Sequence, residues 1–389
     1  MPGRIEDYGL IGDCESAALI GRDGSIDWLC WPRFDSDACF AALLGAPEHG
    51  RWLVAPTDSA AKSSRRYRGD TLVLETRFET SSGAVLVIDF MPPRGGRASD
   101  LMRLVVGERG SVAMHLELIV RFGFGAATPW VTRIDEGVWS AVAGPDRVVL
   151  HTDVPVHGEN MKSVADFTVD AGQSVAFTLT YCPSHLDPLA IPIPDVHAAL
   201  ADTELFWTEW IAKARPVQRW SGEIKRSLIT LRALIHQQTG GIIAAPTTSL
   251  PEQLGGTRNW DYRYCWLRDA TLTLLALMNG GYYEEATAWR DWLLRAIAGS
   301  PEDMQIMYGV AGERRLTEWE VSWLPGYEGA RPVRVGNEAH AQLQIDVFGE
   351  VMDAMHQARD AGLAQLEAAW ALQRALLEHL GNIWEQPDY

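Results

Sequence analysis

The chain has 389 residues, a length at which two domains are the usual expectation. Apolar residues make up 47% and charged residues 22%, which is the composition of a globular protein with material for a sizeable core. The formal net charge is −17, and acidic proteins repel nucleic acid and anionic membranes, so we expect neither as a partner.

The cysteines and the N-terminal segment indicate in which cellular compartment the protein resides. The five cysteines are scattered without a CxxC pair, which favours reduced, mostly buried thiols over a disulfide framework. The segment MPGRIEDYGLIGDCESAALIG carries early acidic residues and no apolar stretch of a secretion signal. No run approaches the roughly eighteen apolar residues of a membrane span. We therefore expect a cytoplasmic protein.

The first half of the chain predicts strands joined in hairpins. Apolar runs flank the turn signal RDG at 22–24 in ESAALIGRDGSIDWLCWP, and the pattern recurs around SG at 82–83 and ERG at 108–110. The segments GVWSAVAGPDRVVLHTDVPV and KSVADFTVDAGQSVAFTLTYCP continue the series. Regularly spaced strands with such turns are typical of an antiparallel β-sandwich, which we expect over residues 1–190.

After the strand region the sequence pattern changes from strands to helices. The Pro-rich break CPSHLDPLAIPIPD and the helical segment VHAALADTELFWTEWIAKA predict a linker over 191–220, and helices then dominate 221–389. The segment SGEIKRSLITLRALIHQQTGG has an apolar stripe and Gly240 as its expected C-terminal stop, while RDATLTLLALMNGG is apolar on nearly every side and predicts a buried helix.

Three further helices complete this half. The segment YYEEATAWRDWLLRAIAGS is amphipathic, NEAHAQLQIDVFGEVMDAMHQARDAG has Asn337 as a candidate N-cap, and LAQLEAAWALQRALLEHLGNIW is the fifth. Alternating buried and amphipathic helices suit a toroid of inner and outer helices. Five helices amount to roughly half of a twelve-helix (α/α)6 barrel.

The stretch NWDYRYCWLRDATLTLLALMNGG, Asn259 to Gly281, crowds rings and charges against the buried helix. An Asp at a helix N-terminus, here Asp269, is most often a cap that contributes about 1 kcal/mol. Arg268 beside an apolar helix needs a partner. The rings could pack an interface or stack on sugar faces, so the residues alone leave packing and ligand binding equally open. The rings are Trp260, Tyr262, Tyr264 and Trp266.

Two other segments combine charges with rings. The connection from Ser300 to Gly336 is long, and long loops inside compact domains are usually functional. Carboxylate pairs are weak evidence of acid–base catalysis in so acidic a chain. The segment DGSIDWLCWPRFDSDACFAALLG favours a structural role. The loop carries Glu313, Arg314, Arg315, Glu318, Trp319, Glu320, Trp323 and Tyr327, and the second segment carries Trp28, Trp31, Arg33 and Asp35.

Other site types are poorly supported by the motifs. The sequence contains no G-x-S-x-G, no P-loop and no HExxH, and the histidines are dispersed. We therefore expect neither a cofactor nor a metal.

Four stretches together resemble bacterial glycoside hydrolase family 15, which contains glucoamylases, related α-glucosidases and a trehalase branch. They are IEDYGLIGDCESAALIGRDGSIDWLCWPRFDSDACFAALLG, APTTSLPEQLGGTRNWDYRYCWLRDA, GERRLTEWEVSWLPGYEGARPVRVGNEA and WEQPDY. The resemblance implies an N-terminal β-sandwich and a catalytic (α/α)6 barrel. It also implies inverting hydrolysis of terminal α-glucosidic bonds in an α-glucoside or oligosaccharide. One Glu protonates the leaving oxygen, and a second, about 6.5–9.5 Å away, activates water.

The resemblance also implies substrate-binding residues. Arg268 and Asp269 match the element that binds the distal hydroxyls of the terminal glucose. Aromatic positions of the same element match Tyr262 and Trp266, and the loop bordering the pocket matches, more loosely, Asn337 and Glu338.

Both catalytic carboxylates are missing from the matched positions. In relatives, the segment resembling NIWEQPDY runs on into the stretch that bears the general acid, and the general base lies further downstream. The chain stops at Tyr389, and Glu385 precedes the expected acid position. We therefore expect a chain truncated in mid-barrel and inactive by itself, with uncovered apolar helix faces that favour self-association.

Two other functions remain open. A disaccharide phosphorylase shares the sandwich-plus-barrel plan, but would use phosphate in place of water and need a basic phosphate site. A non-catalytic carbohydrate-binding fragment would bind sugar without cleaving it. The sequence does not separate trehalose from malto- or isomalto-oligosaccharides as the substrate.

Overall fold

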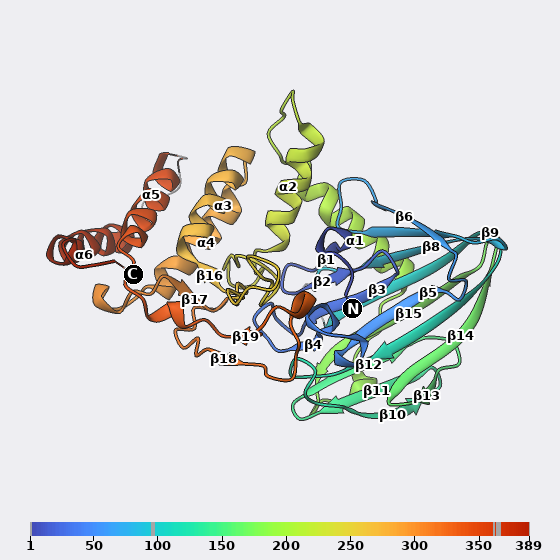
Figure 1. Cartoon of the computed structure of the whole chain (residues 1–389). Helices are drawn as coiled ribbons and strands as arrows, with labels where there is room; N and C mark the ends of the chain where they lie inside the picture. Colours follow the sequence, from blue (N-terminus) through green and yellow to red (C-terminus); the bar gives the residue numbers. More distant parts are fainter. Residues whose placement is uncertain (1, 95–97, 361, 363–366, 389) are drawn as a thin grey trace. The chain divides into compact units, whose positions relative to one another are not determined.

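A computed structural model describes residues 2–94, 98–360, 362 and 367–388 (Figure 1). The chain divides into two compact units. Unit 1 comprises Met1–Glu209, Pro251–Thr257 and Val321–Arg331, and unit 2 comprises Trp210–Leu250, Arg258–Glu320 and Pro332–Tyr389. The long connection 300–336 therefore contributes to both units.

Unit 1 is built on a large antiparallel sheet, as the alternating apolar runs predict. The hairpin turns at 22–24 and 82–83 are confirmed, since each joins two paired strands. In the described part of the chain the strands of this sheet are β1 (Gly9–Gly12), β2 (Ala17–Ile20), β3 (Ser25–Cys30), β4 (Ala38–Phe40), β5 (Arg51–Pro56), β6 (Lys62–Tyr67), β7 (Leu74–Glu79), β8 (Gly83–Phe90), β9 (Ser99–Ile119), β10 (Trp130–Asp135), β11 (Val138–Ala143), β12 (Asp146–His151), β13 (His157–Glu159), β14 (Lys162–Asp170) and β15 (Ser174–Pro183).

The predicted hairpin at residues 108–110 is wrong, because β9 runs without a break through this point. Gly110 pairs with Gly83 and has a positive φ of 67°. The first half of β9 pairs with β8 and β15, and the second half pairs with β5 and β14. The glycine signal therefore marks the point where one long strand changes partners, not a reversal of the chain.

The core of unit 1 lies between the strand groups that share β9. One cluster of buried side chains contains Val54 of β5, Leu116 of β9 and Val148 of β12. Trp28 and Trp31 are also buried, and Trp31 Nε1 donates to Ser99 Oγ at 2.7 Å. These contacts confirm the structural interpretation of the two tryptophans.

Unit 2 is helical. Helix α3 packs against α2, α4 and α5, and α5 packs against α6 (Figure 1). Among the described residues its α-helices are α2 (Ser221–Ala233), α3 (Leu267–Gly280), α4 (Tyr283–Ala296), α5 (Asp346–Asp360) and α6 (Glu367–Ile383). The helix that precedes them, α1 (Val196–Ile211), lies almost wholly in unit 1. Short strands and a 3-10 helix occupy the connections: β16 (Cys265–Trp266), β17 (Met307–Tyr308), β18 (Trp319–Glu320), β19 (Arg334–Val335) and η7 (Glu338–Ala341).

Three helix predictions need correction. Helix α2 ends at Ala233 and not at Gly240, because the backbone of 235–242 closes a tight turn in which Ile235 and Ile242 form a β-bridge. Helix α3 is not buried on every side, since Leu272 is 62% exposed. Asn337 is an N-cap, but of η7, and α5 begins only at Asp346. Residues 363–366, predicted to begin the last helix, and Tyr389 lie outside the described residues.

Candidate functional site

A buried ion pair holds the segment that precedes α3. Arg263 donates from Nε to Asp261 Oδ1 at 2.9 Å and from a terminal nitrogen to Oδ2 at 2.7 Å. Both side chains are fully buried. Asp261 Oδ2 also accepts the backbone N–H of Gly336 at 3.1 Å. Two of the charges in the aromatic stretch therefore satisfy each other and hold the segment against the loop that ends at Gly336.

The first four candidate residues lie at the N-terminal end of α3. The rings of Tyr262 and Trp266 lie 6.2 Å apart between centroids, and the guanidinium carbon of Arg268 lies 5.7 Å from the centroid of Trp266. Arg268 and Asp269 form an ion pair at 3.3 Å, with side chains 48% and 41% exposed. Two rings and a partly exposed pair of opposite charges therefore lie together in the short stretch Tyr262–Asp269.

Asp269 does not serve as the helix cap that its position suggests. The N-cap of α3 is Trp266, whose side chain makes no capping hydrogen bond. Asp269 lies inside the first turn, where a carboxylate interacts favourably with the helix dipole. Its side-chain oxygens therefore stay available, apart from the contact with Arg268.

Asn337 and Glu338 lie in a second group. Asn337 Nδ2 donates to the backbone oxygen of Asp261 at 3.0 Å, and its Oδ1 caps η7. This buried amide therefore fixes the backbone directly before Tyr262, the first residue of the first group. Glu338 is exposed, and its backbone N–H donates to Glu318 Oε2 at 3.3 Å. Among the described residues no hydrogen bond or ion pair joins Glu338 to Arg268 or Asp269.

An ion pair and a cation–π contact fix the loop residues around the second group. Arg334 forms an ion pair with Glu318 at 3.0 Å, and its guanidinium carbon lies 4.5 Å from the centroid of the Trp260 ring. Gly336 has a φ of 82°, and a Cβ there would lie 2.1 Å from the backbone oxygen of Thr317. Only glycine fits this close approach between the two sides of the loop.

Two buried polar atoms near Trp266 have no hydrogen-bond partner. They are Trp266 Nε1, a donor, and Gln305 Oε1, an acceptor. Strand β16, which ends at Trp266, pairs with β17, which begins two residues after Gln305. An unsatisfied buried polar atom calls for a partner such as a ligand or water. Gln305 was not among the predicted residues, since an isolated glutamine in a long loop carries no pattern.

Helix α5 adds a carboxylate that the sequence did not single out. Glu350 is half-buried, and burial together with the nearby Asp346 and Asp353 raises its pKa, while Arg268 lowers it. Asp269 acts in the same direction as the other acids. A carboxyl with a raised pKa beside exposed charges is typical of functional sites. Its proximity to Arg268 depends on the packing of α5 against α3, which no local pattern reveals.

Among the described residues, no group of three or more His, Cys, Asp or Glu side chains is placed to hold a metal ion. No helix in this part of the chain is both long enough and apolar enough to span a membrane. All five cysteines are buried, as their scattered positions predict.

Two family models match the chain, and their order agrees with the predicted order of a strand-rich region followed by a helical region. Residues 1–197 match the model described as trehalase-like, N-terminal, and residues 221–389 match the model of glycosyl hydrolases family 15. The chain belongs to glycosyl hydrolases family 15. The family 15 model covers all the candidate site residues, from Tyr262 to Glu338.

Curated relatives of this family 15 chain are trehalases. A trehalase of Mycolicibacterium smegmatis is 31% identical over 99% of the chain, and one of Thermoplasma volcanium is 28% identical over 99%. Trehalase 1 of Sulfolobus acidocaldarius is 32% identical over 91%. The aligned regions cover 61%, 62% and 60% of these relatives, so the chain spans about three fifths of their length.

Among solved structures, a putative kojibiose phosphorylase from the human microbiome is similar to the family 15 chain at a TM-score of 0.48 and 8% sequence identity. The likeness covers 78% of this chain and 49% of that one. At this score it decides nothing about the reaction.

Proposed function

We propose that the protein containing these 389 residues hydrolyses a terminal α-glucosidic bond with inversion, and that trehalose is its substrate. The observation that carries this proposal is the pair of family matches, which run from a trehalase-like N-terminal region into a family 15 region. The trehalases similar to the chain over 91–99% of its length favour trehalose over malto- and isomalto-oligosaccharides.

In this proposal the open pair at the start of α3 binds the terminal glucose. Arg268 donates to sugar hydroxyls and Asp269 accepts from them, which suits a ligand whose every hydroxyl both donates and accepts. The faces of Tyr262 and Trp266 pack against the pyranose ring. Asn337 and Glu338 border the pocket, and Asn337 acts mainly through its hydrogen bond to Asp261.

The helices of unit 2 are proposed to form the first half of an (α/α)6 barrel over 221–389, after a β-sandwich over 1–190 and a linker over 191–220. Large apolar side chains that remain exposed on α3, on α6 and directly after α6 support this arrangement, because further barrel helices would cover them. Without such cover these faces favour self-association. They are Leu272, Trp370, Leu377 and Trp384.

The chemical step needs two carboxylates, a proton donor and a base. By the family resemblance neither lies among residues 1–389. We therefore assign substrate binding to this part of the protein and expect residues 1–389 alone to leave trehalose intact.

The test uses a longer protein that contains residues 1–389 and the downstream coding sequence. We expect it to hydrolyse trehalose to one α-glucose and one β-glucose, followed by NMR before the anomers equilibrate. Arg268→Ala and Asp269→Ala are expected to lower kcat/KM by about a hundredfold or more, since each removes a charged hydrogen-bonding group from the transition state.

The matched control is Asp291→Ala. Asp291 follows Arg290 on α4, and the two form an ion pair at 3.0 Å between sequence neighbours, as Arg268 and Asp269 do. Asp291 lies outside the proposed pocket. Turnover at the wild-type rate in both Arg268→Ala and Asp269→Ala would refute the proposal that these residues bind the terminal glucose. Release of glucose 1-phosphate only when phosphate is present would refute hydrolysis in favour of a phosphorylase.

A further inference from the structure

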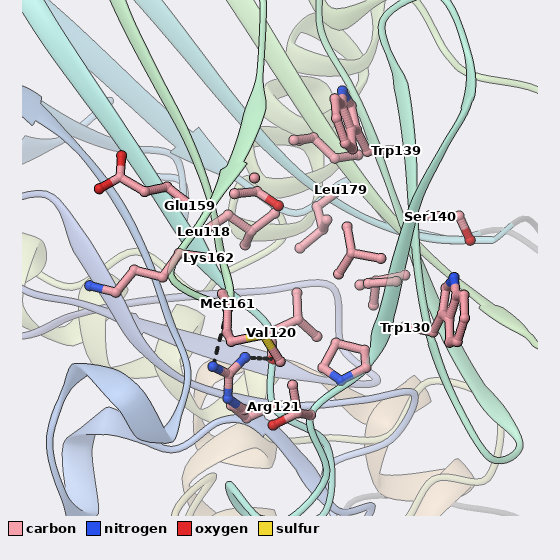
Figure 2. A pocket seen from close by; sticks show the side chains of 18 of the residues that line it. Leu118, Val120, Arg121, Trp130, Trp139, Ser140, Glu159, Met161, Lys162 and Leu179 are labelled. Atoms are coloured by element: carbon pink, nitrogen blue, oxygen red, sulfur yellow. Dashed lines mark hydrogen bonds between the residues drawn. The ribbon is translucent and has the colours of Figure 1, made fainter.

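Unit 1 contains a cavity that the proposed function does not use. It has a volume of about 540 Å³ and lies among strands β9, β10, β11, β12, β14 and β15 (Figure 2). This volume falls within the roughly 300–1,000 Å³ that is usual for small-molecule sites. Much of the lining is aliphatic, including Leu118, Val148, Leu150 and Leu179.

Two tryptophans flank the cavity on the β10–β11 hairpin. Trp130 is 77% exposed, and Trp139 is partly buried against the core. Opposite them in Figure 2 lies Met161, which is 71% exposed. Large apolar side chains exposed around an apolar cavity indicate a surface that a ligand covers.

A half-buried cation lines the same cavity. Arg121 donates to the backbone oxygen of Val120 at 2.7 Å and to that of Met161 at 3.1 Å, as Figure 2 shows. A guanidinium has five N–H donors, so these two bonds leave others open. Within the part of the chain that the structure describes, no carboxylate forms an ion pair with Arg121. Burial lowers its pKa, and no nearby acid offsets that effect.

Neighbouring cations are neutralised differently. Glu117 forms ion pairs with Arg51 at 2.6 Å and with Lys162 at 2.7 Å. Lys162 also lines the cavity, but it is held in an ion pair with Glu117, which it shares with Arg51. Among the described residues that line the cavity, Arg121 is therefore the cation without an ion pair, and an incoming anion could supply one.

We propose that this cavity binds a carboxylic acid with an aliphatic chain, whose tail packs among the aliphatic residues and whose carboxylate pairs with Arg121. The hydrocarbon chain matches Leu118, Leu150 and Leu179, which offer no hydrogen bonds. The carboxylate accepts from the open N–H groups of the guanidinium in a charge-assisted geometry.

A sugar fits the same cavity less well. Sugars need many hydrogen-bonding partners, because each buried hydroxyl without one is costly. Of the buried side chains that line the cavity, Ser140 and Ser163 are polar, while Ala141, Val148 and Leu150 are not. Aliphatic walls beside a cation without an ion pair favour an amphipathic anion.

The backbone at Met161 supports the assignment. Asn160 and Met161 form the turn between β13 and β14, with φ values of 48° and 61°. Asparagine tolerates this left-handed region, whereas methionine is strained there. An exposed, strained apolar residue at the edge of a cavity suits a side chain that closes over a bound tail.

The test is calorimetric titration of the 389-residue chain with decanoate, and separately with decanol as the uncharged analogue. We expect decanoate to bind, and Arg121→Gln to weaken it about tenfold to a hundredfold, the loss of one charge-assisted hydrogen bond. Decanol should bind the wild type and Arg121→Gln equally. The control Arg133→Gln removes an exposed cation of β10 and should leave both affinities unchanged.

Several outcomes would overturn the assignment. They are absence of decanoate binding to the wild type, equal decanoate affinity in Arg121→Gln, or binding of trehalose in competition with decanoate. If Arg121→Gln does not fold, the wild type alone decides. Decanol binding as tightly as decanoate would then contradict a carboxylate paired with Arg121.

Discussion

At the scale of single residues, the buried pair of Asp261 and Arg263 separates structural charges from available ones. The sequence shows four charged residues from Asp261 to Asp269 without distinguishing buried from exposed ones. The structure buries the first pair completely and leaves Arg268 and Asp269 open. This distinction depends on burial by the loop at Gly336, which is 75 residues from Asp261 in the sequence. For that reason local sequence could not reveal it.

Asp261→Asn should strongly destabilise unit 2. The change leaves the guanidinium of Arg263 buried without its counter-charge, and breaking such a pair costs about 3–5 kcal/mol. Urea unfolding followed by tryptophan fluorescence measures the loss. Asp291→Asn, in a partly exposed pair with Arg290, should change the free energy of unfolding by less than about 1 kcal/mol. Equal effects of the two variants would contradict a bracing role for Asp261.

Glu350 should make the stability of unit 2 depend on pH. Burial and the neighbouring Asp346 and Asp353 raise its pKa above the ordinary value of 4.5. Below that value the carboxyl is protonated in both states, and its contribution to stability is fully present. As pH rises through the folded-state pKa, the buried charge is penalised and the contribution is lost.

Glu350→Gln should therefore raise Tm at pH 7 and leave it nearly unchanged at pH 4. Thermal unfolding at the two pH values measures the difference, and Glu378→Gln, an exposed change on α6, is the control. A Tm difference that is the same at both pH values would show that the carboxyl is not perturbed.

At the scale of elements, local signals succeed where the chain follows local geometry. The turns at 22–24 and 82–83 join neighbouring strands, as their glycine signals predict. The same signal at 108–110 lies inside β9, because distant strands pair with both halves of this strand. Likewise, Asn337 caps a short 3-10 helix and α5 begins later. In β9, long-range strand pairing overrides the local turn signal.

The β13–β14 turn offers a direct measurement of strain. Met161→Gly should raise the free energy of unfolding of unit 1 by about 0.5–1 kcal/mol, since glycine adopts the left-handed region without the penalty of a Cβ. Urea unfolding measures the gain, and Asn160→Gly should give a smaller one because asparagine already tolerates this conformation. A loss of stability in Met161→Gly would show that the methionine side chain stabilises the empty protein.

At the scale of the whole molecule, the sequence predicts the order of a β region and a helical region, and both family models match in that order. Composition and periodicity could not identify a substrate, since rings beside charges also suit plain packing. The structure adds that Asp269 is not the N-cap and that Trp266 Nε1 is buried without a partner. Both observations weaken the packing explanation for this turn of chain.

In the proposed function, the turn formed by Trp266, Arg268 and Asp269 binds a glucose unit. Saturation-transfer NMR of the 389-residue chain with millimolar trehalose tests it most directly. We predict transfer to the sugar protons in the wild type and in Asp291→Ala, and its loss in Asp269→Ala. Absence of transfer in the wild type, or undiminished transfer in Asp269→Ala, would contradict the claim.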